Sequence, residues 1–149
     1  MMRRMYALMC AGAMLVTGFS CKNVNNGGTE CTAPANGIME LVAPAGGGSY
    51  SVGDTVTIEF KFDKLKVASV EIQVYDIGVM DWVNIVETSI PGEGADNNQC
   101  KTFVWIIGSG TDRIDYSRGG FGYKVRIAEY GNNSGNNDES AAFTINPRE

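Results

Sequence analysis

The chain has 149 residues, about the length of one domain, and carries 12 Lys and Arg against 17 Asp and Glu, for a formal net charge of −5. This acidic balance argues against a nucleic-acid partner, because phosphates require a basic face. His is absent, which excludes Ser-His-Asp and Cys-His catalysis and every His-ligated metal site. We therefore expect no enzymatic activity, no cofactor and no metal centre.

The first twenty residues are typical of an export signal. Arg3 and Arg4 precede a mostly apolar, uncharged run at residues 6–19, and the chain turns polar from Lys22 onward. A basic head, a short apolar middle and a small residue before the cut define a secretory signal peptide. The apolar run is short for a membrane-spanning helix, which needs about 20 apolar residues. We expect residues 1–20 to be removed; an uncleaved N-terminal anchor is the alternative.

The predicted cleavage site, Gly-Phe-Ser-Cys at residues 18–21, resembles the lipobox of bacterial lipoproteins. That resemblance implies that Cys21 carries a lipid, which anchors the protein in the bacterial cell envelope, at the outer membrane or the cell surface. Two or more acyl chains would hold it almost permanently, since each buried methylene contributes about 0.8 kcal/mol. Residues 21–36, with Asn and Gly at 25–28, are expected to form a flexible tether. The alternative is ordinary secretion without a lipid.

Cysteine usage also fits export. Cys10 leaves with the signal and Cys21 would be acylated, so Cys31 and Cys100 remain as an even pair. An oxidising compartment would allow them to form a disulfide. Closing about 70 residues would stabilise the fold by about 4 kcal/mol. The alternative is a pair of free, buried thiols.

The remaining chain shows the two-residue alternation of β-strands. Residues 55–62 place Val56, Ile58, Phe60 and Phe62 on one face. The expected strands are residues 38–42, 55–62, 67–75, 81–87, 102–107, 123–128 and 141–145. The segments between them contain turn residues such as Gly, Asn and Asp.

These features predict an all-β fold, with residues 37–147 as an immunoglobulin- or fibronectin-III-like two-sheet sandwich of about seven strands. A barrel is the alternative, but polar outward faces on most strands favour the sandwich. Trp105 has an inward phase and is expected in the core. Tyr123 begins the penultimate strand, where its hydroxyl is expected to bond to nearby backbone as a tyrosine corner.

An ordered set of short motifs resembles the immunoglobulin-like N-terminal domain of the fungal cell-wall-synthesis proteins, a family also described as Ser/Thr-rich and GPI-anchored, with many bacterial relatives. The set includes Leu-Val-Ala-Pro, a Gly-rich turn, Val-Glu-Ile-Gln-Val, Phe-Val-Trp, Tyr-Lys-Val-Arg-Ile and a closing Phe-Thr-Ile. The matching segments are residues 41–44, 46–60, 70–74, 103–105, 122–127 and 138–145. The resemblance implies the sandwich fold and a role in cell-wall organisation.

The sequence contains residues of the types used in three kinds of site. Trp82, Tyr75 and Tyr116 fall on outward phases or in loops, and such aromatic faces bind sugars. Loop acids such as Asp112 and Asp115 could hold calcium, but ordinary turn chemistry explains them better. An acid pair for glycoside hydrolysis needs two carboxyls in a cleft. Glu59 and Glu71 are instead expected to be solvated, on outward faces of neighbouring strands.

The sequence therefore predicts a lipid-anchored, non-enzymatic module of the bacterial envelope or cell surface that acts in adhesion or binding. Its partners would be a membrane, through Cys21, and an envelope glycan or another envelope protein. Two alternatives stay open: a carbohydrate-binding or cell-wall-organising module, and a structural accessory lipoprotein of a larger assembly.

Overall fold

The computed structural model describes residues 31–86, 88–109, 112–132 and 135–147. The predicted signal peptide, Cys21 and tether residues 22–30 lie outside the described residues. The compact unit spans Cys31–Glu149, so residues 31–36 belong to it rather than to the tether. Asn36 illustrates this, since its side-chain oxygen accepts hydrogen bonds from the N–H groups of Ile38 and Met39.

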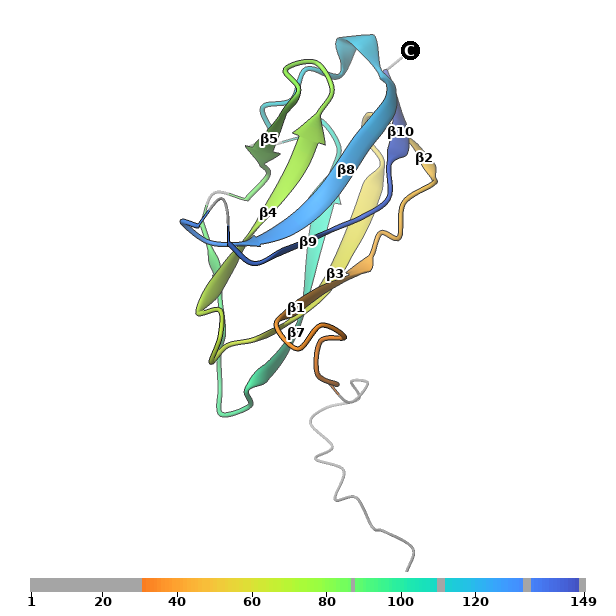
Figure 1. Ribbon diagram of the computed structural model, residues 1–149. Helices are drawn as coiled ribbons and strands as arrows, with labels where there is room; N and C mark the ends of the chain where they lie inside the picture. Colours follow the sequence, from red (N-terminus) through yellow and green to blue (C-terminus); the bar gives the residue numbers. More distant parts are fainter. Residues whose placement is uncertain (1–30, 87, 110–111, 133–134, 148–149) are drawn as a thin grey trace, which may run out of the picture. The chain divides into compact units, whose positions relative to one another are not determined.

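The unit is built from two β-sheets (Figure 1). The first has the order β1 (Met39–Ala43), β3 (Thr55–Asp63) and β7 (Asn98–Ile106). The second has the order β2 (Ser49–Ser51), β10 (Phe143–Asn146), β8 (Gly120–Glu129), β4 (Ser69–Asp76) and β5 (Asp81–Asn84). In this second sheet β6 (Ile90–Pro91) also pairs with β4, and β9 (Asn137–Glu139) pairs with β8. A short 3-10 helix, η1 (Tyr116–Arg118), precedes β8.

The arrangement is an immunoglobulin-like sandwich, as the sequence predicts. The chain switches sheets after its first strand: β1 pairs antiparallel with β3, and β2 pairs parallel with β10. The peptide bond before Pro44, between these two strands, is cis. The division into two separate sheets distinguishes the fold from the barrel alternative. In Figure 1, β4 and β8 cross in front of β3 and β7.

The core lies between the sheets and follows the alternation of the strands. On β3, the residues at even positions from Val56 to Phe62 are at most 3% exposed. Trp105 of β7 is buried, as expected. The second sheet contributes buried side chains from three strands: Val70, Ile72, Val74, Tyr123, Val125, Ile127, Phe143 and Ile145.

Three strands were not expected from the sequence: β2, β6 and β9, each of two or three residues. The expected strand at residues 81–87 is shorter in the structure, and β7 begins earlier, at Asn98. The expected last strand at residues 141–145 begins later, as β10 at Phe143, and residues 140–142 separate β10 from β9. At that break the Val125 N–H donates to the Ser140 hydroxyl, and the Ser140 N–H donates to the Val125 C=O. A side-chain oxygen thus takes the place of one backbone acceptor between the strands.

Candidate functional site

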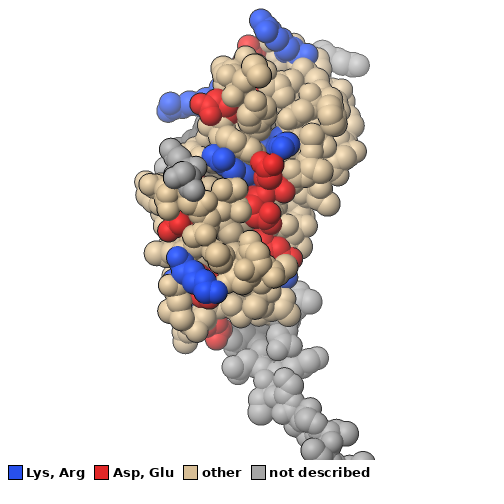
Figure 2. All heavy atoms as spheres, in the orientation of Figure 1, with Lys and Arg blue, Asp and Glu red and all other residues tan. Residues whose placement is uncertain are grey.

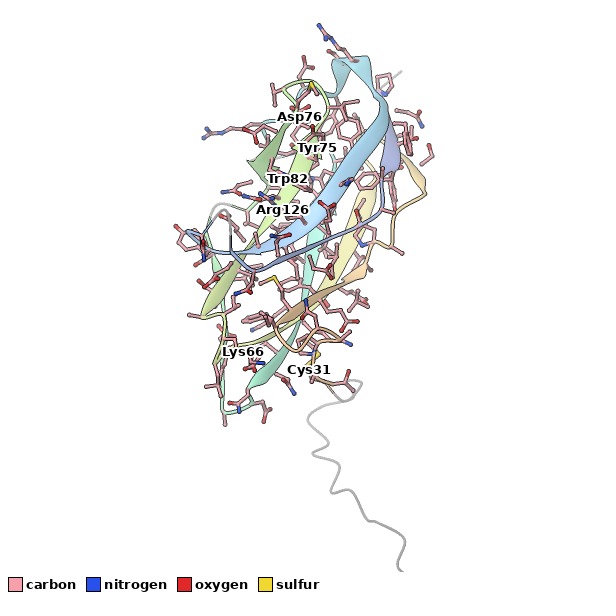
Figure 3. All side chains as sticks on the ribbon, in the orientation of Figure 1. Cys31, Lys66, Tyr75, Asp76, Trp82 and Arg126 are labelled. Atoms are coloured by element: carbon pink, nitrogen blue, oxygen red, sulfur yellow. A yellow bond between two sulfur atoms is a disulfide. The ribbon has the colours of Figure 1, made fainter. Side chains whose placement is uncertain are left out.

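Two of the three predicted platform residues meet on the outer face of the second sheet. Tyr75 of β4 lies directly opposite Trp82 of β5 in the antiparallel register. Directly opposed residues point to the same face, so their rings come together. The ring centroids lie 5.4 Å apart with planes at 67°, an edge-on contact. Figure 3 shows the two side chains in one row with Arg126.

Arg126 of β8 fixes the tryptophan from the other side. Its guanidinium carbon lies 4.2 Å from the centroid of the Trp82 ring, a cation–π contact. Its Nε donates a 2.6 Å hydrogen bond to the side-chain oxygen of Gln73, the residue opposite it on β4. The guanidinium is thus tied to both neighbouring strands. Sequence alternation places Arg126 on an outward phase, but only the cross-strand register brings it to Trp82.

A row of hydrogen-bonded polar side chains continues this surface along β4. The Gln73 amide donates to Glu71 Oε1 at 3.0 Å, and the Asn84 amide of β5 donates to Glu71 Oε2 at 3.3 Å. Glu71 is 5% exposed and Gln73 is 6% exposed. The expectation that Glu71 is solvated is therefore wrong, because its neighbours cover it. We call the surface formed by Tyr75, Trp82, Arg126, Gln73, Glu71 and Asn84 the platform.

Acidic and basic side chains both lie around the platform. Burial lowers the pKa of Arg126, while Glu71, Glu139 and Asp81 favour its charged form and oppose that shift. Next to it, Lys124 Nζ lies 2.9 Å from Glu139 Oε1. In Figure 2, acidic and basic side chains lie side by side on this face of the molecule.

The third predicted platform residue, Tyr116, is not on this surface, and that prediction is wrong. Tyr116 is 6% exposed and packs on Tyr123, with ring centroids 5.8 Å apart. Its hydroxyl donates a 2.6 Å hydrogen bond to Asp112 Oδ2. Burial, reinforced by that bond and charge, raises the pKa of Tyr116 far above its ordinary value. The short helix η1 turns this ring into the core.

Asp112 joins the aromatic residues at this end of the core. Besides the Tyr116 hydroxyl, its Oδ2 accepts from Trp105 Nε1 at 2.9 Å and from the Gly108 N–H at 3.1 Å. Its Oδ1 accepts from the Ile114 N–H. These donors occupy the carboxylate that the calcium alternative required. Across the described part of the chain, no group of three or more acidic or Cys side chains is arranged to hold a metal ion.

Tyr123 has a structural role, but not the one expected. Its side chain is fully buried between the sheets and packs near Phe143, with ring centroids 6.5 Å apart. Its hydroxyl has no hydrogen-bond partner among the described residues, so the tyrosine-corner prediction is wrong. Burial, followed by the charge of Asp76, raises its pKa.

The acid pair and the cysteine pair have different outcomes in the structure. Glu59 lies on β3 and Glu71 on β4, which belong to different sheets, so they are not on neighbouring strands as expected. Cys31 and Cys100 lie at disulfide distance, with their sulfur atoms 2.11 Å apart. The predicted lipidation site, Cys21, falls outside the described residues. Among those that are described, no helix is long and apolar enough to cross a membrane.

No protein-family model and no curated protein matches the chain. The resemblance to the fungal cell-wall-synthesis proteins stays a prediction. The geometry of the platform is therefore the main basis for a functional proposal.

Proposed function

We propose that this chain is a non-enzymatic binding module, held at the bacterial cell envelope by a lipid on Cys21, that engages its ligand through the platform. The observation that carries the proposal is the fixed position of Trp82. Arg126 covers it at 4.2 Å and Tyr75 meets it edge-on at 5.4 Å. An aromatic side chain held in place loses little conformational entropy when a ligand binds.

The tether supports the same reading. Residues 22–30 include the run Asn-Asn-Gly-Gly, which is typical of a flexible linker. Cys31 pairs with Cys100, so the anchored end of the chain joins the sandwich at β7. The platform is on the other sheet. Anchoring raises the effective concentration of the module near the envelope, so that weak contacts become sufficient.

A neutral saccharide is the ligand chemistry that the platform fits best. Sugars combine an apolar face, which packs on aromatic rings, with hydroxyls that bond to planar polar groups. The platform offers both: the rings of Tyr75 and Trp82, and the polar side chains of Asn84 and Arg126. No hydrogen bond is formed by the terminal nitrogens of Arg126 within the described residues.

A retention assay tests this proposal. The full chain, purified in mild detergent, would be incubated with insoluble envelope polysaccharide and applied to a glycan array. We expect retention by the wild-type protein and a loss of affinity of about tenfold or more in Trp82→Ala, typical of a binding hot spot. Tyr130→Ala is the matched control, since Tyr130 is an exposed aromatic outside the platform. Equal retention of all three proteins, or no retention of any, would contradict the glycan proposal.

A further inference from the structure

The four strands that end the two sheets differ in how well their free edges are protected. β1 is interrupted by a bulge between Leu41 and Ala43, and the Leu41 N–H is bonded to the carboxylate of Asp138. β2 and β5 have only three and four residues. Short length, bulges and covering side chains are the usual means of preventing edge-to-edge association.

β7 lacks these features. It has nine residues and pairs with β3 in unbroken register from Asn98 to Ile106. Its first part is covered: the Gln99 side chain bonds to the Glu93 N–H and the Asp96 C=O, and Lys101 forms an ion pair with Glu93 at 3.1 Å. The second part, residues 102–106, contains neither a charge nor a proline. We call these five residues the open edge.

The backbone of the open edge points away from its own sheet. The Ile107 N–H bonds to the Asp54 C=O, so residue 107 faces the chain that leads into β3. Because the direction alternates along an antiparallel strand, the polar groups of Thr102, Val104 and Ile106 face outward. Within the described chain, no hydrogen bond outside the ladder reaches the backbone of Thr102 or Val104. Among the described residues, the Ile106 C=O accepts from the N–H and the hydroxyl of Ser109.

The side chains of the open edge are apolar as well as exposed. Val104 is 57% exposed and Ile106 is 45% exposed, on the outer face of the first sheet. An exposed, flat, apolar edge is a template for another β-strand. The partner that would pair with the open edge is an uncharged segment in extended conformation.

We propose that the partner is a second copy of this chain, paired antiparallel through the open edge about a two-fold axis at Val104. In that register Val104 of one copy faces Val104 of the other, and Thr102 of one copy faces Ile106 of the other. The open edge is therefore complementary to itself. At Val104 the outward N–H of each copy then meets the outward C=O of the other, and the Ile106 N–H meets the Thr102 C=O of the other copy. The open edge carries no charge, so two copies can approach there without the repulsion expected between chains that each have a net charge of −5. The two platforms stay free, on the other sheet of each copy.

Analytical ultracentrifugation of the full chain in density-matched detergent tests the association. We expect the wild-type mass to rise from monomer to dimer with concentration, and Val104→Lys to remain monomeric. Thr57→Lys is the matched control, because Thr57 lies opposite Val104 on β3, on the same outer face but one strand from the edge. Circular dichroism checks that each variant is folded. A monomer at every concentration would overturn the proposal, as would a dimer that Thr57→Lys abolishes and Val104→Lys does not.

Cross-linking tests the register without adding charge. In Val104→Cys the two new thiols would lie on residues about 5.5 Å apart between Cα atoms, within disulfide range. In Thr57→Cys, three strand spacings would separate the copies by about 14 Å, which is too far. We expect a disulfide dimer from the first variant only. Equal cross-linking of both variants would overturn the two-fold register.

A peptide with the sequence of residues 101–107 distinguishes a second copy from other extended partners. It should compete with dimer formation, while a scrambled peptide should not. Equal competition by both peptides would overturn the choice of a second copy in favour of a general strand acceptor.

Discussion

The Arg126 guanidinium carbon lies 4.2 Å from the centroid of the Trp82 ring, and this contact links β8 to β5 across β4. Arg126 also donates to Gln73 on the intervening strand. The flat guanidinium makes both contacts at once, through its face and through its Nε–H. The position of Trp82 therefore depends on the shape of Arg126 as well as on its charge.

Replacing Arg126 with Lys tests this dependence. Lys keeps the charge but loses the flat stacking surface and the Nε–H, so Arg126→Lys should destabilise the fold by about 1 kcal/mol. Urea unfolding measures the change, and near-ultraviolet circular dichroism reports whether Trp82 loses its fixed surroundings. Lys124→Arg, on the same strand beside Glu139, is the control and should have little effect. Equal stability of Arg126→Lys and wild type would show that shape is unimportant.

Two buried tyrosines should respond in opposite directions to loss of the hydroxyl. Tyr116 donates to Asp112, so Tyr116→Phe should destabilise the protein by about 1–3 kcal/mol. The Tyr123 hydroxyl has no described partner, so Tyr123→Phe removes an unsatisfied polar group and should be neutral or stabilising. Denaturant midpoints of the two variants measure the difference. A strong destabilisation by Tyr123→Phe would mean that the hydroxyl is bonded in solution.

Stability should fall at alkaline pH. Burial raises the pKa of both Tyr116 and Tyr123 in the folded protein, while a tyrosine in the unfolded chain titrates near pH 10. Below that pH both tyrosines are protonated in the folded and the unfolded state, so their contribution to the free energy of unfolding is fully present. Above it the unfolded state loses protons first, so the free energy of unfolding decreases as pH rises.

The slope of this decrease should be smaller in Tyr116→Phe than in wild type. Unfolding curves measured between neutral pH and pH about 11 provide the comparison. Tyr130→Phe is the control, because Tyr130 is 56% exposed. Identical slopes for wild type and Tyr116→Phe would refute the assignment of the alkaline loss to that residue.

The link between Cys31 and Cys100 should stabilise the fold by restricting the unfolded chain. The two residues are 69 positions apart in the sequence. Replacing both with Ser should lower the free energy of unfolding by about 4 kcal/mol. Unfolding of wild type with and without a reducing agent should show a similar difference. If reduction leaves the midpoint unchanged, the pair does not form a stabilising disulfide in solution.

Much of the fold could be predicted because each long strand has one face in a common core. Residues 55–62 alternate without interruption, and they match β3 within one residue. The short strands β2 and β9 could not be found this way, since three residues do not establish a period. The gap between β9 and β10 depends on the contact between Ser140 and Val125, which no local pattern reveals.

The candidate site was predicted only in part, for a similar reason. Tyr75 and Trp82 have outward phases on strands that follow each other in the chain, so their contact could be predicted from the sequence. Arg126 reaches them through a pairing with Gln73, 53 residues away. Tyr116 was misplaced because it lies in an aperiodic segment, where a hydrogen bond to Asp112 decides its position.

The most direct test of the central claim, that the platform binds the ligand, uses the two tryptophans of the chain as internal probes. Trp82 belongs to the platform, whereas Trp105 is buried and bonded to Asp112. Their indole N–H signals would be followed by nuclear magnetic resonance while soluble fragments of envelope polysaccharide are added, with Trp82→Ala assigning the peaks. We predict a saturable shift of the Trp82 signal with the Trp105 signal unchanged. No shift of the Trp82 signal, or a shift of the Trp105 signal alone, would contradict the account.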